Sequence, residues 1–88
     1  MTVWVDIDGA AHSGCYQCTC ECGTKWLGQG ERHALGWYCP VAPLAEVVLH
    51  LNLDHGGVEL ELRMSPRYRD WLGRYWSRHQ QMRGVVPA

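Results

Sequence analysis

Residues 14–23 read GCYQCTCECG and place four cysteines within eight positions, while a fifth, Cys39, stands alone in GWYCP. Disulfides, redox chemistry and a metal site each offer a use for such crowding. An odd number of cysteines fits a closed set of disulfides poorly, and clustered thiols in a reducing compartment more often bind metal. The segment therefore favours a metal site.

The chain has 88 residues, enough for one small domain whose hydrophobic core alone gives marginal stability. Five Trp and four Tyr enlarge that core, but a metal staple would add to it. No apolar run is long enough to span a membrane. The N-terminal MTVWVDIDG carries acids where a signal peptide carries bases. We therefore expect a cytoplasmic protein with reduced thiols and no membrane partner.

Residues 1–42 are expected to be the β-rich, cysteine-containing part of the domain. VWVDI reads as a strand, Asp8-Gly9 as a turn, and HSGCYQCTC as the returning strand of a hairpin. CGTKWL and WYC are further short strand candidates. Because side chains alternate along a strand, Cys18, Cys20 and Cys22 would share one face if the strand were regular.

The rest of the chain predicts a helix over 43–55, a strand over 58–63 and a C-terminal helix over 65–83. Apolar residues of the first helix recur with helical spacing and predict one buried stripe: Leu44, Val47, Val48 and Leu51. Gly56-Gly57 ends that helix, VELELR alternates as a half-buried strand does, and Ser65-Pro66 is a typical helix start. The sequence thus predicts one small α+β domain over 1–88, stabilised by zinc.

His50 and His55 end the first predicted helix as H-x4-H, a spacing found in Cys2His2 zinc fingers. Positions five apart on an ideal helix differ by about 140°, so His55 must lie where the helix unwinds. Ten residues lie between Cys39 and His50, close to the roughly twelve that separate the second Cys from the first His in such fingers. Gly23 lets the backbone turn just after Cys22, so CECG is the preferred donor turn. The predicted zinc ligands are Cys20, Cys22, Cys39, His50 and His55.

Other uses of the thiols remain open from the sequence. Cys15 and Cys18 have the commonest ligand spacing and could supply the first pair, or could bind a second metal with His12 and His33. Clustered thiolates could hold an iron–sulfur cluster, although the spacing matches no ferredoxin. A redox dithiol would need a helix N-terminus, where a strand is predicted. Apart from that second-metal option, His12, His33 and His79 read as isolated, solvated or packing residues.

The charge is distributed unevenly along the chain. Residues 1–62 carry eight acids and two bases, a formal charge of −6, whereas residues 63–88 carry six Arg and one Asp, a charge of +5. The basic helix either binds a partner or neutralises its own acidic body. Trp and Arg are enriched in protein interfaces, and we expect partner contacts from four residues of this helix: Arg67, Arg74, Trp76 and Arg78.

No residue set typical of an enzyme or of a small-molecule site is visible, so a binding module is expected. A protein partner is favoured over DNA, because the acidic body would repel phosphates. DNA binding through the basic aromatic helix is the alternative, and a thiol-redox protein is the third. The oligomeric state is not readable from the sequence.

VVLHLNLDHG and SPRYRDWL resemble segments of small, mostly uncharacterised proteins of actinobacterial phages, with a helix like H-L-N-D-x-H followed by S-R-E-x-I-A-D-W-L. The matching residues are His50, Leu51, Asn52, Asp54 or Leu53, His55, Ser65, Arg67, Asp70, Trp71 and Leu72. The likeness covers about a third of the chain, and GGVELELRM and Pro66 depart from it. It implies a phage origin and a zinc-finger-like unit, but it supplies no activity. The protein partner expected from the last helix is a host or viral one.

Overall fold

The computed structural model describes residues 1–82 of the chain. They form a mixed four-stranded sheet and two helices, which confirms the predicted α+β class. The elements are β1 (Thr2–Gly9), β2 (Cys15–Cys20), β3 (Lys25–Gln29), α1 (Ala42–Asp54), β4 (Glu59–Met64) and α2 (Pro66–Met82). Residue 83, the last of the predicted C-terminal helix, lies outside the described residues.

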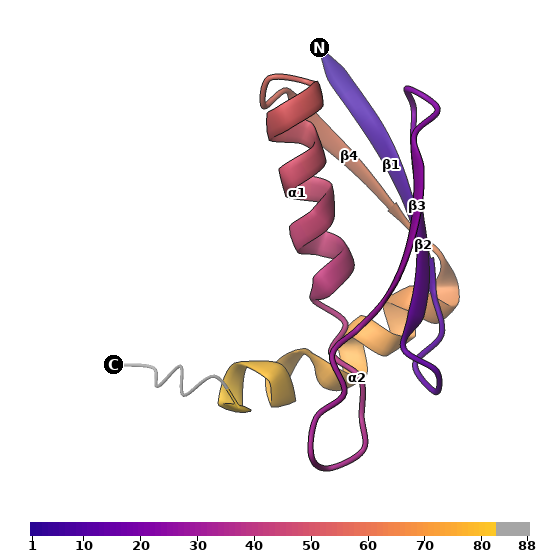
Figure 1. The fold of residues 1–88 in the computed structure, drawn as a ribbon, viewed down its shortest axis with the longest axis vertical. Coiled ribbons are helices and arrows are strands. Elements are labelled where there is room, and N and C mark those ends of the chain that lie inside the picture. The colour runs from indigo at the N-terminus through magenta and orange to yellow at the C-terminus, as the bar shows by residue number, and fades with distance from the viewer. Residues whose placement is uncertain (83–88) are drawn as a thin grey trace.

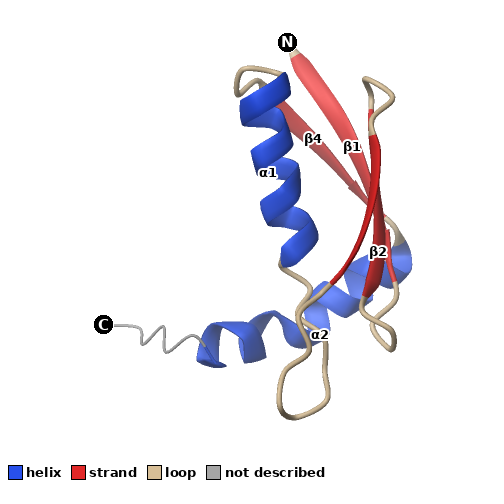
Figure 2. Ribbon diagram, viewed as in Figure 1, coloured by secondary structure: helices blue, strands red, loops and turns tan. Residues whose placement is uncertain are grey.

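The sheet has the strand order β3-β2-β1-β4. β1, β2 and β3 are antiparallel neighbours, whereas β4 pairs with β1 in parallel. A parallel pair needs a crossover connection, and α1 lies within it. Figure 1 shows α1 running along the sheet and α2 lying across one end of it, and Figure 2 separates the helices from the strands by colour. None of the helices in the described part of the chain is long and apolar enough to cross a bilayer.

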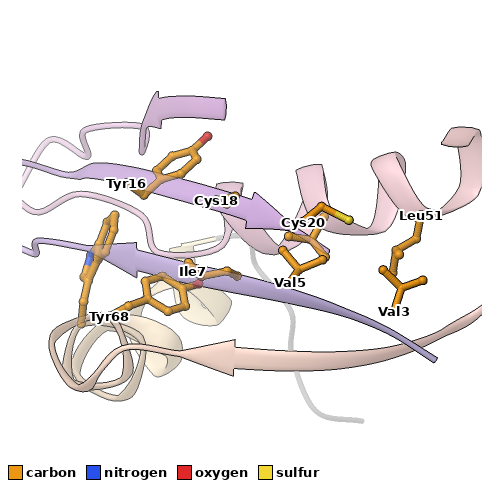
Figure 3. Close-up of a cluster of buried hydrophobic side chains, with 10 residues drawn as sticks. Val3, Val5, Ile7, Tyr16, Cys18, Cys20, Leu51 and Tyr68 are labelled. Atoms are coloured by element: carbon orange, nitrogen blue, oxygen red, sulfur yellow. The ribbon is translucent and has the colours of Figure 1, made fainter. Parts of the chain in front are cut away.

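Both helices contribute to one hydrophobic core, formed on a single face of the sheet (Figure 3). Alternate residues of β1 and β2 point into it because the side-chain period of a strand is two. The buried members are Val3, Val5, Ile7, Tyr16, Cys18, Cys20, Val47, Leu51, Tyr68 and Trp71. Apart from Gly9, which is buried on the core side, the other residues of β1 and β2 lie on the opposite face and are exposed or half-buried.

The aromatic rings of α2 attach this helix to the segment before α1. Trp71 is fully buried and donates its indole N–H to the Tyr38 carbonyl at 2.9 Å. Tyr68 donates its hydroxyl to the Pro40 carbonyl at 2.6 Å. A Cβ at Gly9 would lie 2.9 Å from the Trp71 ring, so the strand can approach the indole only without a side chain there. Trp71 therefore belongs to the core.

Four expectations from the sequence differ from the structure. Asp8 and Gly9, predicted to form a turn, are the last residues of β1, and the chain turns over residues 10–14. Cys22 lies beyond the end of β2, in a turn, so it does not continue the strand face of Cys18 and Cys20. WYC forms no strand, and only an isolated bridge joins Arg32 to Tyr38. Val48, predicted to be buried, is 54% exposed, because α1 turns only a narrow stripe toward the sheet.

The start of α2 is fixed by a polar cluster. The Ser65 hydroxyl accepts the backbone N–H of Tyr68 at 3.2 Å, as an N-cap does, and donates to Asp8 Oδ1 at 2.6 Å. Arg67 adds a bidentate ion pair with both Asp8 oxygens at 2.8 Å. These partners, Arg67 first, lower the pKa of Asp8 from 3.8 to about 2.

We predict that Asp8→Asn lowers the free energy of unfolding by about 1 kcal/mol at pH 7, since Asp8 and Arg67 are both largely exposed and water screens the pair. The folded pKa is depressed, so this stabilisation is present above pH 4 and is lost as the pH falls toward 2. Denaturant titrations of both proteins between pH 7 and pH 3 measure the difference. Asp70→Asn, which breaks the exposed Arg74 pair, is the control. A constant difference across this range would contradict the assignment.

Candidate metal centre

Two cysteines and two histidines converge at one end of α1. Cys20, Cys22, His50 and His55 each offer one ligand atom, and these four atoms all lie within 4.8 Å of one another. Two sulfurs and two imidazole nitrogens form the donor set of a Cys2His2 zinc site. The structure thus brings together four of the five predicted ligands, although they are up to 35 residues apart in the chain.

The thiols are presented by the tight connection between β2 and β3. Cys20 pairs with Thr24 at the end of the ladder, where its N–H donates to the Thr24 carbonyl at 2.8 Å. The three residues between them form the turn, and Gly23 takes the positive φ of 93° that this turn requires. Cys20 therefore faces the core while Cys22 projects from the turn, and both sulfurs lie near α1.

The histidines are presented by the end of α1. His50 lies in the last turns of the helix, and His55 is the C-cap with a non-helical φ of −125° and ψ of 4°. The prediction that the helix unwinds at His55 is confirmed. Gly56 and Gly57 follow with φ of 67° and 77°, and the Gly57 N–H bonds back to the Leu51 carbonyl. This glycine ending turns His55 toward the same side as His50.

The distances fit a tetrahedral zinc ion. Zn–S bonds of about 2.3 Å and Zn–N bonds of about 2.0–2.1 Å that meet at a tetrahedral angle place sulfur and nitrogen about 3.6 Å apart. Cys20 Sγ lies 3.5 Å from His55 Nε2, and Cys22 Sγ lies 3.6 Å from His50 Nε2. The side chains therefore already have the spacing that the ion needs.

A carboxylate orients one of the imidazoles. Asp54 Oδ2 lies 2.7 Å from His50 Nδ1, one helical turn away. With Nδ1 protonated and donating to this carboxylate, the lone pair of Nε2 faces the Cys22 sulfur. Such carboxylate–histidine pairs are typical of metal-bound imidazoles, because they fix the tautomer and raise the basicity of the ligand.

The two thiols differ electrostatically. Hydrogen bonds from the hydroxyl and backbone of Thr24 lower the pKa of Cys22 to about 6, and the Thr24 hydroxyl lies 3.2 Å from the sulfur. Burial instead raises the pKa of Cys20. A thiolate is the metal-binding form of cysteine, so Cys22 is ready to bind at neutral pH. Cys20 would ionise as the ion arrives.

Cys39 does not belong to this group, which corrects the prediction that placed it there. It leads into Pro40 and α1 at the opposite end of the helix from His50, and its sulfur lies with His33 and His79 instead. The near-match to zinc-finger spacing was misleading, because the residues between Cys39 and His50 are mostly helical and separate the two. The expectation that His33 and His79 are isolated is also wrong, because both lie beside Cys39.

The other cysteines lie apart from both groups. Cys15 is exposed and Cys18 is buried, on opposite faces of β2. Burial also raises the pKa of Cys18 to about 12. A redox pair between these two thiols, an iron–sulfur cluster on all four, and the group with His12 and His33 therefore have no geometric basis in the described residues. Cys18 is a core hydrophobe.

The predicted partner residues of α2 are exposed, but two of them pair within the domain. Arg67 binds Asp8, and Arg74 binds Asp70 at 2.9 Å. Arg78 lies over the Tyr75 ring at 5.8 Å. Trp76 is 41% exposed beside an open groove of about 500 Å³. Besides the groove at Trp76, α1 carries a second apolar surface that was not expected from the sequence. It is formed by Val48, Leu49 and Leu53.

We predict that Asp54→Asn weakens zinc binding about 10- to 100-fold, because His50 loses the partner that orients its ring. Competition with a chromophoric chelator measures the affinity. Asp6→Asn, on the uncovered face of the sheet, is the matched control and leaves it unchanged. Equal affinities for the two variants would show that Asp54 does not support the metal ligand.

No protein-family model matches the chain, and no curated protein and no solved structure is significantly similar to it.

Proposed function

We propose that the protein is a small zinc-stabilised binding module, whose metal centre holds the fold and whose surface binds another protein. The observation that carries the proposal is the convergence of Cys20, Cys22, His50 and His55 with sulfur–nitrogen distances of 3.5 and 3.6 Å. Four ligands close the coordination sphere of zinc, which is typical of structural rather than catalytic sites. The proposed role is therefore not enzymatic.

Zinc is the proposed metal because of the donor chemistry. Tetrahedral sites of two thiolates and two imidazoles favour zinc among the common ions, whereas magnesium and calcium prefer oxygen ligands. The group contains no carboxylate ligand, since Asp54 contacts the imidazole. The orientation of His50 supports the same ion.

The fold itself has a need that zinc would meet. α1 buries only Pro43, Val47 and Leu51 of its thirteen residues, so hydrophobic contact holds it weakly. A structural zinc contributes roughly 10–16 kcal/mol in small peptides, which is comparable to the whole unfolding free energy of a typical domain, about 5–15 kcal/mol. An ion that joins the β2–β3 turn to the end of α1 would fix the helix on the sheet.

The proposed partner is a protein, and the resemblance to phage proteins suggests a host or viral one. Two surfaces support this class. The groove beside Trp76 is lined mainly by apolar side chains, including Leu44 and Leu72, and α1 exposes Leu49 and Leu53 at 57% and 73%. Trp and Arg often dominate protein interfaces, and Arg69 lines the same groove.

DNA binding remains the second candidate, with less support. Among the arginines that were expected to meet phosphates, Arg67 and Arg74 already contact carboxylates of the domain. The Arg67–Asp8 pair favours the interpretation that α2 neutralises the acidic body, whereas the Arg74–Asp70 pair lies within α2 itself. A duplex would also face the acidic residues of the sheet, and repulsion grows as salt is lowered.

We predict that excess EDTA abolishes the cooperative thermal transition of the purified protein, because zinc binding free energy is folding free energy here. Cys22→Ser should lose one zinc per chain and unfold in the same way. The metal content is measured by elemental analysis and the transition by circular dichroism.

Cys15→Ser is the matched control for that experiment, since Cys15 is an exposed cysteine outside both metal groups. It should keep the metal content and the melt of the wild-type protein. An unchanged melt of the wild-type protein in excess EDTA would contradict the structural role of zinc.

We also predict no binding to duplex DNA at low ionic strength, measured by fluorescence anisotropy. A complex whose affinity falls steeply with salt would overturn the protein-partner proposal in favour of DNA. A protein partner, once cross-linked to the wild-type chain, should be lost with Trp76→Ala. It should be retained with Leu35→Ala, which removes an even more exposed apolar residue of another segment, 77% exposed against 41% for Trp76.

A further inference from the structure

A second group of metal-binding side chains lies between the segment before α1 and the C-terminal half of α2. One ligand atom each from His33, Cys39 and His79 lie within 4.8 Å of one another. Cys39 is buried, and both histidines are half-buried. One thiolate and two imidazoles are the ligands that zinc and its neighbours in the periodic table prefer.

Two of these residues, His33 and Cys39, lie in a loop over residues 31–39 that backbone hydrogen bonds hold in place. The His33 N–H donates to the Trp37 carbonyl and the Gly36 N–H donates to the His33 carbonyl, both at 2.8 Å. Gly36 takes a φ of 89°, as the tight turn requires. The Cys39 N–H donates to the Glu31 carbonyl at 2.8 Å, which closes the loop and places Cys39 beside His33.

Stacked rings hold that loop against α2. Trp37 stacks on His33 with centroids 3.9 Å apart, and on Tyr75 with centroids 5.3 Å apart and planes within 5°. Along α2 the residues facing this segment follow helical spacing, namely Tyr68, Trp71, Tyr75 and His79. His79 is thus the last member of the stripe that attaches α2 to the loop, and the stripe places it at Cys39.

An independent feature points to a ligand at this group. His33 Nε2 is buried and has no hydrogen-bond partner among the described residues. A buried polar atom of this kind costs about 1–3 kcal/mol. A metal bound to that nitrogen would remove the cost, whereas an ordinary packing histidine would carry it.

A zinc ion at this group would replace the proton that Cys39 and His79 share in a hydrogen bond. Cys39 Sγ lies 2.9 Å from His79 Nδ1, which is the distance of a short hydrogen bond. When zinc takes the place of the shared proton, the two atoms separate to about 3.6 Å. His79 is half-buried, whereas Cys39 is buried, so the shift falls on the His79 ring.

We propose that His33, Cys39 and His79 form a second zinc site, with three protein ligands and a fourth position open to water or a small anion. Three ligands with an open position are typical of zinc that exchanges ligands, whereas four closed ligands are typical of a structural ion. This site binds zinc more weakly than the first and ties the 31–39 loop to α2. It does not depend on the function proposed above.

The test is a titration of the reduced, metal-free chain with Co²⁺, followed by its thiolate-to-cobalt and d–d absorption. Wild-type protein should take up two equivalents in two steps. His79→Gln or Cys39→Ala should lose one equivalent and only the weaker step. Cys22→Ser should lose both steps, because the chain does not fold without the structural ion. Azide should shift the cobalt bands of the weaker step alone, because only that ion has an open position.

His12→Gln and Cys15→Ser are the matched controls, since both residues are exposed and lie outside the two groups. They should keep two equivalents. Retention of the tighter step in His79→Gln shows that the variant still folds. The second site would be overturned, and the first left untouched, if the wild-type protein took up only the tighter equivalent, or if both His79→Gln and Cys39→Ala still took up two. The structural centre would instead be overturned if the wild-type protein took up only the weaker equivalent.

Discussion

The fold depends on one junction, where the turn between β2 and β3 meets the C-terminal end of α1. The helix has few buried residues, and its outward side is unusually apolar for an exposed surface. Cys20 and Cys22 on the turn and His50 and His55 on the helix lie at tetrahedral zinc spacing. A metal there would convert a weakly packed helix into a fixed crossover between the antiparallel strands and β4. The parallel pairing of β4 with β1 follows from that crossover.

The opposite end of the domain is organised by α2. Its buried rings donate to the carbonyls of Tyr38 and Pro40, and the Ser65 cap and Arg67 both meet Asp8 on β1. These contacts fix the loop that carries His33 and Cys39. The two Cys/His groups therefore lie at opposite ends of α1, and each joins a loop or turn to a helix. This arrangement explains how a chain with a small core can still specify one structure.

The sequence was sufficient to predict the α+β class, the two helices and four of the metal-binding residues. Periodicity and caps carry the first two, since Gly56-Gly57 and Ser65-Pro66 are local signals. Four residues of the candidate metal centre could be predicted because a glycine turn follows the thiols and the helix ends at the histidines: Cys20, Cys22, His50 and His55. The number of residues between Cys39 and His50, however, does not determine which end of the helix Cys39 will contact. Cys39 was therefore wrongly assigned to the group of His50 and His55. The pairing of His79 with Cys39 depends on the position of α2, which only tertiary packing decides.

The most direct measurement of the central claim is X-ray absorption at the zinc edge on protein loaded with one equivalent of zinc. The account predicts a four-coordinate ion with two sulfurs at about 2.3 Å and two imidazole nitrogens at about 2.0–2.1 Å. The same spectrum is expected from Cys39→Ala, because Cys39 is not a ligand of the tighter site. A first shell of four sulfurs, or one of oxygen and nitrogen alone, would contradict the account.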